Sequence, residues 1–359
     1  MAAAVHVTKS SIGTVTLVES ALPVLGKDAV RLRVESFSVT ANNVTYAAIG
    51  DRFGYWNFFP TGKDGHGIVP MWGHAVVEAS THNEVAVGER VYGYLPMGTH
   101  LDVEPGDISA GQFRDLTAHR QPMSPFYNLY SRLAADPEHV PEREDARMIF
   151  GPLFKTGFLI EAMFRREGWH GAQSLIMSSA SSKTAMALAH CAKASSPGIR
   201  RIGLTSAGHV DFVRATGLYD DVLAYGDVTE LPKTPSVFVD FAGNSAVLTT
   251  VHTHLGAELA YSCLVGATHI EARGAGDGTP LPGPAPILFF APDHATATVK
   301  DLGGKGFALA VAASWGGFVA ATDGFVTVDH REGLAAAADA FLTTVKGAAD
   351  PAVGIVVLP

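Results

Sequence analysis

The chain has 359 residues and a formal net charge of −9, and 47% of its residues are hydrophobic while 17% are charged. This composition is typical of a folded protein that is large enough for two domains, and it excludes a disordered chain. The negative charge gives no electrostatic reason to expect nucleic acid or an anionic membrane surface as a partner. Two cysteines are too few for a disulfide framework or for a four-cysteine zinc site.

The first residues, MAAAVHVTKSSIG, lack a basic region followed by an apolar core and therefore predict no signal peptide. The longest charge-free stretch in the C-terminal part, Gly306–Thr322, is rich in glycine and alanine and is shorter than the ~20 apolar residues of a membrane-spanning helix. We therefore expect a cytoplasmic protein with no membrane partner. Cys191 and Cys263 lie among apolar or small residues and are expected to be buried free thiols.

The first part of the chain, from Val5 to about Leu101, has the pattern of short β-strands. In Ala29–Ser36 (AVRLRVES) apolar and charged residues alternate, which is typical of a half-buried strand. Asn42–Pro60 is dense in aromatic residues and too irregular for a core strand. Several short strands separated by turn residues predict a compact barrel-like or sandwich domain. Further short runs follow at Met71–Glu78, Glu84–Ala86 and Arg90–Tyr94.

Strands and helices alternate in the middle of the chain. A connecting or lid segment, Leu116–Pro141, precedes a helix predicted at Phe150–Phe164 from its stripe of aromatic and aliphatic residues. Continuous apolar strands that alternate with helices predict a parallel sheet covered on both faces. The predicted strands are Ser174–Met177, Arg201–Thr205, Asp221–Leu223, Ser236–Phe241, Glu258–Val265 and Ile287–Ala291, and the helices between them are Ser182–Ala194, His209–Thr216 and Asn244–Leu255.

The C-terminal part predicts a return to the first domain. It contains a strand at Phe325–Val328, an alanine-rich amphipathic helix at Arg331–Lys346 and an apolar strand at Gly354–Leu358. Such an apolar strand needs a sheet to join, and the N-terminal β-domain is its natural host. The predicted organisation is a β-rich domain formed by residues 1–145 and 301–359, with a second domain of residues 146–300 between its two parts.

One strand–turn–helix segment, Ser174–Ala194 (SLIMSSASSKTAMALAHCAKA), offers a site for chemistry. A short apolar strand is followed by the polar turn Ser178–Thr184 and by a helix with small residues on one face. The free N–H groups at the start of such a helix bind phosphate. Nucleotide-binding turns normally contain glycines, whereas this one contains serines and Lys183. Two interpretations stay open: phosphate binding by hydroxyls and an ammonium group, or a polar helix start with Ser181 or Ser182 as N-cap.

The order of these segments resembles the medium-chain dehydrogenase/reductase superfamily, in particular its zinc-independent quinone-oxidoreductase and enoyl-reductase branch. Val30–Asp51 is similar to the opening strand and active-site segment of this family, and Val87–Tyr94 (VGERVYGY) resembles its GDRV turn. Ser174–Ala194 is similar to the first cofactor strand, phosphate loop and helix. The remaining similar segments are Val222–Asp227 (VLAYGD), Val237–Asn244 (VFVDFAGN) and Leu264–Ile270 (LVGATHI) in the sheet, and Arg331–Pro359 in the closing helix and strand.

The resemblance implies an α/β fold in which a doubly wound, parallel Rossmann domain is inserted into a β-rich, GroES-like catalytic domain. It also implies NADP(H) as the cofactor and hydride transfer between the nicotinamide C4 atom and a carbonyl-conjugated substrate. The absence of the phosphate-loop glycines marks a divergent branch. The residues placed at the cofactor are Ser178, Ser179, Ser181, Ser182, Lys183, Thr184, Thr205, Ser206, His209, Tyr225, Phe241, Gly243, Val265 and Gly266.

The end of the second predicted sheet strand favours NADP(H) over NAD(H). The segment Leu204–Ser206 contains no Asp or Glu, and an acid here would bind the ribose 2′-hydroxyl of NAD and repel a 2′-phosphate. Tyr225 occupies a position where related reductases often place a tyrosine near this phosphate. Surface packing is the alternative for His209 and Tyr225. The candidate contacts of the 2′-phosphate are Lys183, Thr205, Ser206, His209 and Tyr225.

The sequence predicts no metal site. Zinc-dependent relatives have a cysteine ligand after the first active-site strand and a His-Glu pair later, whereas this chain has Thr40–Asn43 there and an alanine after His74. His252 and His254 are two residues apart, which is a poor spacing for one helix face. Without zinc, the substrate must be polarised by hydroxyls, amides or the nicotinamide ribose.

The candidate catalytic residues are Asn43, Tyr46 and Tyr55, all in the aromatic segment. A tyrosine could protonate an enolate after hydride addition, and an amide could orient the carbonyl. Tyr46 aligns with a tyrosine of the quinone-oxidoreductase relatives. The alternative is that the aromatic residues of this segment only close a hydrophobic lid.

The sequence therefore predicts an NADPH-dependent, zinc-independent reductase of a small apolar α,β-unsaturated or quinone-like carbonyl. A non-catalytic binding or scaffold protein that keeps the fold is the main alternative. A P-loop nucleotide-binding protein with Lys183 and Asp240 is less consistent, because the two glycines that it requires are replaced by Met177 and Ser182. A homodimer formed through the sheet edge at Ile287–Ala291 would fit the resemblance.

Overall fold

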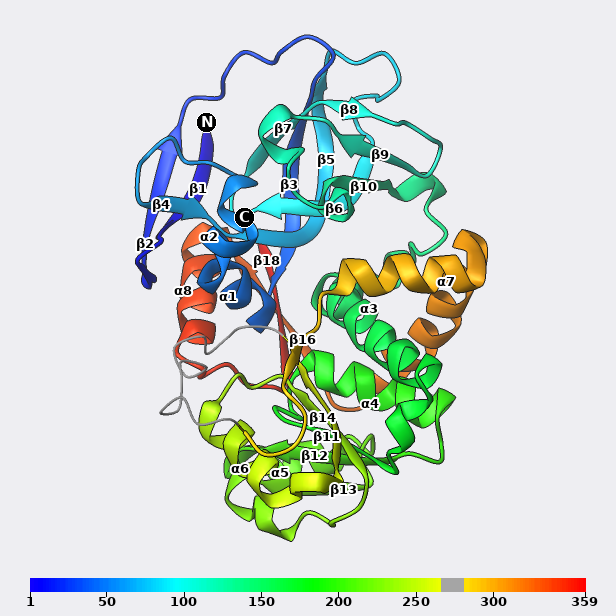
Figure 1. Cartoon of the computed structure of the whole chain (residues 1–359). Coiled ribbons are helices and arrows are strands. Elements are labelled where there is room, and N and C mark those ends of the chain that lie inside the picture. Colours follow the sequence, from blue (N-terminus) through cyan, green and yellow to red (C-terminus); the bar gives the residue numbers. More distant parts are fainter. Residues whose placement is uncertain (266–280) are drawn as a thin grey trace. The chain divides into compact units, whose positions relative to one another are not determined.

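The structure, a computed structural model, describes residues 1–265 and 281–359, and its contacts divide the chain into two compact units. Unit 1 consists of Met1–Ile149 and Val328–Pro359, and unit 2 consists of Phe150–Thr327 (Figure 1). The predicted insertion of an α/β unit into a β-rich one is confirmed. The boundary predicted after residue 300 differs from the observed one, because it falls inside helix α7 (Ala291–Thr322), all of which belongs to unit 2.

Unit 1 is built on antiparallel strands. A three-stranded sheet has the order β2-β1-β4, and a nine-stranded sheet has the order β17-β18-β3-β5-β6-β10-β9-β8, with β7 also paired to β3. The predicted apolar strand near the end of the chain is β18, and it pairs with β3 as expected. The strands are β1 (Ala2–Thr8), β2 (Ser11–Ser20), β3 (Val30–Val39), β4 (His66–Ile68), β5 (Pro70–Ser80), β6 (Arg90–Pro96), β7 (His100–Val103), β8 (Pro105–Gly106), β9 (Gln112–Asp115), β10 (Leu129–Arg132), β17 (Thr327–Glu332) and β18 (Val353–Leu358).

Strand β3 forms where apolar and charged residues alternate. Its apolar residues Val30, Leu32 and Val34 are buried, as the pattern predicts. Arg31 is buried as well, because its guanidinium donates to both carboxylate oxygens of Asp102, at 2.8 and 2.7 Å. The alternation therefore identifies the core face of the strand, and an ion pair across to β7 explains the exception.

The aromatic segment after β3 forms short helices. These are α1 (Ala41–Ala48), α2 (Gly50–Phe53) and the single 3-10 turn η1 (Tyr55–Asn57). Helix α1 begins with a capping box, in which Asn43 accepts from the backbone N–H of Thr40 at 2.6 Å. Helix α8 (Gly333–Val345), close to the predicted range, packs against α1, β2 and β18 in the same unit.

Unit 2 contains a six-stranded parallel sheet with the order β13-β12-β11-β14-β15-β16. Every residue of β11 and β14 is buried, as expected for strands covered on both faces. The chain runs outward from β11 to β13, returns to β14 on the other side of β11, and then runs outward again, which is the order of a doubly wound sheet. The strands are β11 (Ser174–Met177), β12 (Arg200–Thr205), β13 (Asp221–Ala224), β14 (Ser236–Asp240), β15 (Leu259–Leu264) and β16 (Ile287–Leu288), and the helices between them include α4 (Lys183–Ser195), α5 (Val210–Ala215) and α6 (Ser245–Leu255).

Helix α3 (Glu144–Arg166) leads from one unit into the other and begins earlier than the predicted helix at 150–164. It contains Pro152, which has no N–H group to donate to the carbonyl of Met148 four residues before it. The hydroxyl of Ser38, on β3, donates to that carbonyl at 2.6 Å. A side chain of the sheet therefore satisfies the backbone group that the proline leaves without a partner.

Helix α7 has no counterpart in the sequence-based prediction. It spans 32 residues and is interrupted at Gly303, whose φ of 71° is not helical. Phe318 anchors it on α3 through ring contacts with Phe150 and Phe154, and Figure 1 shows the two helices side by side. The many small residues of this segment give no 3.6-residue apolar period. Within the residues that the structure describes, no helix is long and apolar enough to cross a membrane.

Candidate functional site

The turn between β11 and α4 adopts a tight conformation although it contains no glycine. Ser182 is the N-cap of α4, and its hydroxyl accepts from the backbone N–H of Ala185 at 3.3 Å. Ser179 has a φ of 50°, in the left-handed region that residues with a side chain rarely adopt. The amide of Ser182 donates to the Ser179 carbonyl at 2.7 Å and closes the turn. The structure thus assigns to Ser182 the N-cap role that the sequence left open.

Ser178 follows β11 directly and is fully buried. Its hydroxyl donates to Oδ1 of Asp240 at 2.6 Å and accepts from the amides of Phe241 and Ala242 at 2.9 and 3.0 Å. The same oxygen of Asp240 also accepts from the Gly243 amide at 3.2 Å. Ser178 therefore ties the turn after β11 to the turn after β14. Its hydroxyl, together with the amides of Phe241 and Gly243, is engaged inside the protein, although all three residues were predicted to contact a cofactor.

Two tyrosines each hold one peptide group of the turn. The hydroxyl of Tyr225 accepts from the Ser179 amide at 2.9 Å. The hydroxyl of Tyr219 donates to the Ala180 carbonyl at 2.7 Å, and the Ala180 amide donates to the carbonyl of Leu204 at 3.0 Å. Tyr219 precedes β13 and Tyr225 follows it, so both side chains reach the turn from the same edge of the sheet.

The other predicted cofactor residues surround the turn unequally. Nδ1 of His209 and Oγ of Ser181 lie 3.2 Å apart, so these two candidates do come together. Thr205 is buried at the end of β12, whereas Ser206, the next residue, is exposed. Lys183 and Thr184 are the partly exposed first residues of α4, and the buried Val265 donates its amide to the Asp240 carbonyl at 2.8 Å. Gly266 lies outside the described residues.

This arrangement is suited to hold an anion. The amides of Ser181 and Thr184 have no hydrogen-bond partner among the residues that the structure describes, and they precede or open the 13-residue helix α4. The turn lies at the carboxyl end of β11, where the strand order reverses, which is the position of the phosphate site in doubly wound sheets. Gly203 on β12 leaves space for the turn, since a Cβ atom there would lie 2.8 Å from Cβ of Ala180.

In unit 1, an aromatic cluster gathers two of the three predicted catalytic residues. The ring centroids of Tyr46 and Tyr55 are 4.6 Å apart, and Tyr94 lies 5.4 Å from Tyr46. The Tyr55 hydroxyl is 3.1 Å from that of Tyr127. The Tyr46 hydroxyl accepts two hydrogen bonds, from Trp72 Nε1 at 3.1 Å and from Asn42 Nδ2 at 2.7 Å. The cluster is formed by residues from α1, η1, β5, β6 and the 3-10 turn η3 (Pro125–Asn128).

The two neighbouring asparagines of α1 have different roles. Asn43, the predicted catalytic amide, is buried; its Nδ2 donates to the Pro70 carbonyl at 2.8 Å and its Oδ1 caps the helix. Asn42 instead donates from Nδ2 to the Tyr46 hydroxyl at 2.7 Å. Both lone pairs of that hydroxyl are therefore occupied by Asn42 and Trp72, so its own proton is left to donate. Burial raises the pKa of Tyr46, and the neighbouring Trp72, Asn42 and Tyr94 side chains partly oppose the rise.

Nothing in the described part of the chain forms a metal site, since no group of three or more His, Cys, Asp or Glu side chains there could hold an ion. His74 is fully buried, and its ring packs on Tyr92 with 5.1 Å between centroids. Burial lowers the pKa of His74 to about 3. His252 and His254 bind Ser262 and backbone carbonyls, which gives both of them structural partners.

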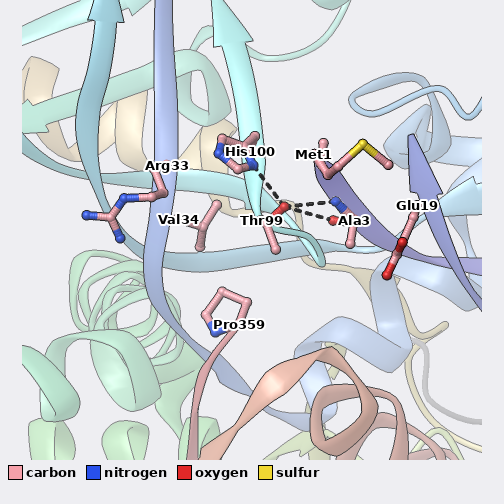
Figure 2. A pocket seen from close by; sticks show the side chains of 9 residues that line it. Met1, Ala3, Glu19, Arg33, Val34, Thr99, His100 and Pro359 are labelled. Carbon is pink, nitrogen blue, oxygen red and sulfur yellow. Dashed lines mark hydrogen bonds between the residues drawn. The ribbon is translucent and has the colours of Figure 1, made fainter. Parts of the chain in front are cut away.

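A separate pocket of about 320 Å³ lies among the strands of unit 1 (Figure 2). Figure 2 shows Thr99, one of the residues that line it, hydrogen-bonded to the backbone of Ala3 and to the His100 ring. Arg33 and Glu19 bring opposite charges to its walls. None of the predicted site residues lines this pocket.

A doubly wound parallel sheet with a helix N-terminus at its reversal point, inserted into an antiparallel β-unit, defines the fold of a medium-chain dehydrogenase/reductase. CurA from Vibrio vulnificus in complex with NADPH matches with a TM-score of 0.62 and 16% identity, over 96% of this chain and 94% of that one. The mycobacterial Rv1454c complexed with NADPH matches with a TM-score of 0.57 and 16% identity, over 100% of both chains. A quinone oxidoreductase of Pseudomonas syringae matches with a TM-score of 0.56 and 16% identity, also over 100% of both.

The chain belongs to the family described as "Protein of unknown function (DUF2855)", whose model matches residues 37–350. No curated protein matches the sequence. The predicted resemblance to the medium-chain dehydrogenase/reductase superfamily is thus confirmed as a shared fold.

Sequence reasoning missed several residues that the structure places at these sites. Tyr219 holds the turn of unit 2, and Asn42 and Trp72 donate to the Tyr46 hydroxyl in unit 1. The helical spacing of four residues between Asn42 and Tyr46 was a readable signal. The pairing of Trp72 with Tyr94 across β5 and β6 could not be read from the sequence, because it depends on the register of the two strands.

Proposed function

We propose that the protein is an NADPH-dependent reductase that delivers hydride to a small apolar α,β-unsaturated or quinone-like carbonyl. The observation that carries this proposal is the turn after β11, which presents the amides of Ser181 and Thr184 at the reversal point of a doubly wound sheet. Solved structures of the same fold from Vibrio vulnificus and a mycobacterium contain NADPH.

Amides at a helix N-terminus and a lysine side chain are the groups of unit 2 proposed to bind the dinucleotide. The amides of Ser181 and Thr184 would bind the pyrophosphate at the N-terminus of α4. No acid follows β12 in the segment of Thr205 and Ser206, so nothing there repels a 2′-phosphate. Lys183 brings a positive charge to the same turn, and His209 lies beside Ser181. When bound, the cofactor would supply the hydride.

In unit 1, Tyr46 is the proposed proton donor. Its hydroxyl accepts from Asn42 and Trp72, and so it can only donate its proton to a further group. The same two donors would stabilise the phenolate that forms when Tyr46 protonates an enolate. Tyr55 and the surrounding aromatic rings would contact an apolar, planar substrate. Asn43 would act only through the position of α1, because its amide is already bound at both ends.

The reaction is proposed to need no zinc. The segment that resembles the zinc-binding region has no cysteine, and His74 is packed inside the sheet with no carboxylate or thiol bonded to it in the described structure. Hydroxyl groups would therefore replace the metal in polarising the carbonyl.

A homodimer is proposed to form at the edge strand β16. Its residues Ile287 and Leu288 are 52% and 41% exposed, and an apolar edge strand is a site for pairing with another strand. Light scattering of the purified protein tests this, and Ile287→Lys should yield monomer if the edge is the interface.

Titration of the purified protein with NADPH and with NADH, followed by nicotinamide fluorescence, tests the proposed function. Binding of NADPH at micromolar concentration, tighter than that of NADH, is expected. If neither dinucleotide binds at high micromolar concentration, the non-catalytic alternative replaces the reductase. Binding of a nucleoside triphosphate with magnesium in place of NADPH would favour the P-loop alternative, with Lys183 and Asp240 as its residues.

Replacement of Lys183 by alanine tests whether its ammonium group contacts the 2′-phosphate or the pyrophosphate of the cofactor. If Lys183 contacts the 2′-phosphate, the variant should weaken NADPH binding more than NADH binding. Equal weakening of both would leave the lysine at most beside the pyrophosphate, which the two cofactors share. The matched control is Lys193→Ala on the last turn of the same helix, where the lysine donates to the Gly217 carbonyl at 3.0 Å.

A further inference from the structure

We infer that Tyr225 and Tyr219 are positioning residues of the dinucleotide site, whose hydroxyls fix the turn after β11 in a conformation for which such turns ordinarily use glycine. This inference rests on the proposed function and deepens it. It assigns the hydroxyl of Tyr225 to the loop backbone, whereas the sequence placed it near the 2′-phosphate.

The need for positioning arises at Ser179. With a φ of 50°, this residue occupies a region in which its Cβ atom crowds the backbone, and glycine is the usual solution. A residue with a side chain keeps such a conformation only when its surroundings hold it. Within the turn, the Ser179 carbonyl accepts from the Ser182 amide at 2.7 Å, and from the sheet side the Tyr225 hydroxyl holds the Ser179 amide at 2.9 Å.

Tyr225 is itself firmly anchored. It follows the last residue of β13, and its ring packs against a buried cluster that includes Ile202 and Leu204 of β12. Because β12 lies between β13 and β11, the side chain must cross the carboxyl end of β12 to reach Ser179. Burial raises the pKa of Tyr225, so the phenol stays neutral and accepts the hydrogen bond at physiological pH.

Tyr219 fixes a second peptide group of the turn, the one between Ala180 and Ser181. It packs with Ala180, Val213 and Val222, and its hydroxyl donates to the Ala180 carbonyl at 2.7 Å. Space for this ring depends on Gly203, where a Cβ atom would lie 3.0 Å from Cδ1 of Tyr219. With both of these peptide groups held, the amides of Ser181 and Thr184, which have no hydrogen-bond partner among the described residues, stay available to a phosphate.

The test compares Tyr225→Phe with the wild-type protein for both dinucleotides. A positioning role predicts that the dissociation constants of NADPH and NADH rise by the same factor, about threefold to tenfold for one lost hydrogen bond, so that their ratio is unchanged. A rise confined to NADPH would overturn the inference, because it would show direct contact with the 2′-phosphate. Tyr261→Phe is the matched control in unit 2, since that ring stacks on His170 and its hydroxyl takes no hydrogen bond within the described structure.

A second substitution tests the conformational part of the inference. In the Tyr225→Phe background, Ser179→Gly should restore most of the lost affinity, because glycine adopts a positive φ without support. Ser179→Ala removes the same hydroxyl but keeps the Cβ atom, and it should restore nothing. Equal effects of glycine and alanine would overturn the inference.

Amide hydrogen exchange of the protein without cofactor gives a readout that does not depend on binding. Tyr225→Phe should speed exchange at the Ser179 amide, and Tyr219→Phe should leave that amide protected while weakening both cofactors. If wild-type protein binds neither dinucleotide, the proposed function fails, and the exchange data still decide whether the tyrosine holds the turn. Unchanged exchange at Ser179 in Tyr225→Phe would refute the positioning role directly.

Discussion

Removal of one hydroxyl, in Ser178→Ala, should cost unit 2 a large part of its stability. The variant loses the hydrogen bond to the Asp240 carboxylate, worth about 1.5–3 kcal/mol for a charged acceptor. It also leaves the buried Phe241 amide without an acceptor, at a cost of about 1–3 kcal/mol. The Ala242 amide keeps Oδ1 of Asp240, so it adds little. Oδ2 of Asp240 has no hydrogen-bond partner among the described residues, so no bond at that oxygen compensates for the one lost at Oδ1.

The sum is about 3 kcal/mol or more, which corresponds to a fall in melting temperature of roughly 6–12 °C for a unit of this size. Differential scanning calorimetry measures it, and the transition of unit 2 is identified by its shift on addition of NADPH if the cofactor binds. Ser206→Ala, at the exposed position that follows the neighbouring strand β12, should change the melting temperature by less than a degree or two. A loss below about 1 kcal/mol in Ser178→Ala would show that the hydroxyl bridge between the two turns is replaceable and would refute the reasoning.

Three further substitutions test other parts of the structure. Tyr46→Phe should lower kcat on a quinone-like substrate by about 10²-fold, the effect of losing a general acid, and should leave the NADPH dissociation constant unchanged. Tyr130→Phe, which removes a hydroxyl bonded to the Tyr94 carbonyl, is the control for a purely structural effect. Equal losses of kcat in the two variants would contradict the proton-donor role of Tyr46. Gly157→Ala should destabilise unit 2 by about 1–3 kcal/mol in thermal unfolding, because the new Cβ atom would lie 2.6 Å from the Leu188 amide nitrogen and 2.9 Å from Cβ of Ala187. Gly226→Ala is the control: a Cβ atom there meets open space, so this variant should unfold like the wild type. Burial raises the pKa of Glu144, but hydrogen bonds from Arg90 and His139 outweigh this effect and lower the pKa to about 2 from an ordinary 4.5. The ionised carboxylate therefore stabilises the fold above pH 4.5, and this stabilisation is lost as the pH falls toward 2. The melting-temperature difference between wild type and Glu144→Gln should shrink across that range, and a constant difference would contradict the assignment.

Much of the fold was predictable because its strands are short, apolar and separated by clear turn residues. Strand β11 has the predicted bounds, and the limits of α4, α6 and α8 agree to within one or two residues. The pattern failed where side chains carry little information. Helix α7 consists largely of alanine and glycine, so neither period nor polarity marks it, and the predicted domain boundary fell inside it.

The site was predictable in position and less so in detail. The sequence locates the turn after β11 because a strand, a polar turn and a helix follow one another in the expected order. It could not show that Ser178 is buried against Asp240, because that contact joins residues 62 positions apart. In the same way, it named Asn43 where the structure directs Asn42 at Tyr46, since adjacent residues of a helix differ by about 100° in direction.

The serine-rich turn shows how one residue type can perform several separate tasks. Ser178 bridges two strand ends, Ser179 adopts the left-handed conformation, Ser181 lies against His209, and Ser182 caps α4. In a glycine-rich turn, the backbone itself provides the conformational freedom and needs few outside partners. Here the same shape depends on hydrogen bonds to residues on or beside three other strands: His209 after β12, Tyr219 and Tyr225 on either side of β13, and Asp240 on β14. A turn built in this way should tolerate substitution of its hydrogen-bond partners poorly. Because the turn has no glycine, its conformation depends on residues of the surrounding sheet, and substitutions there should affect the site as much as substitutions in the turn itself.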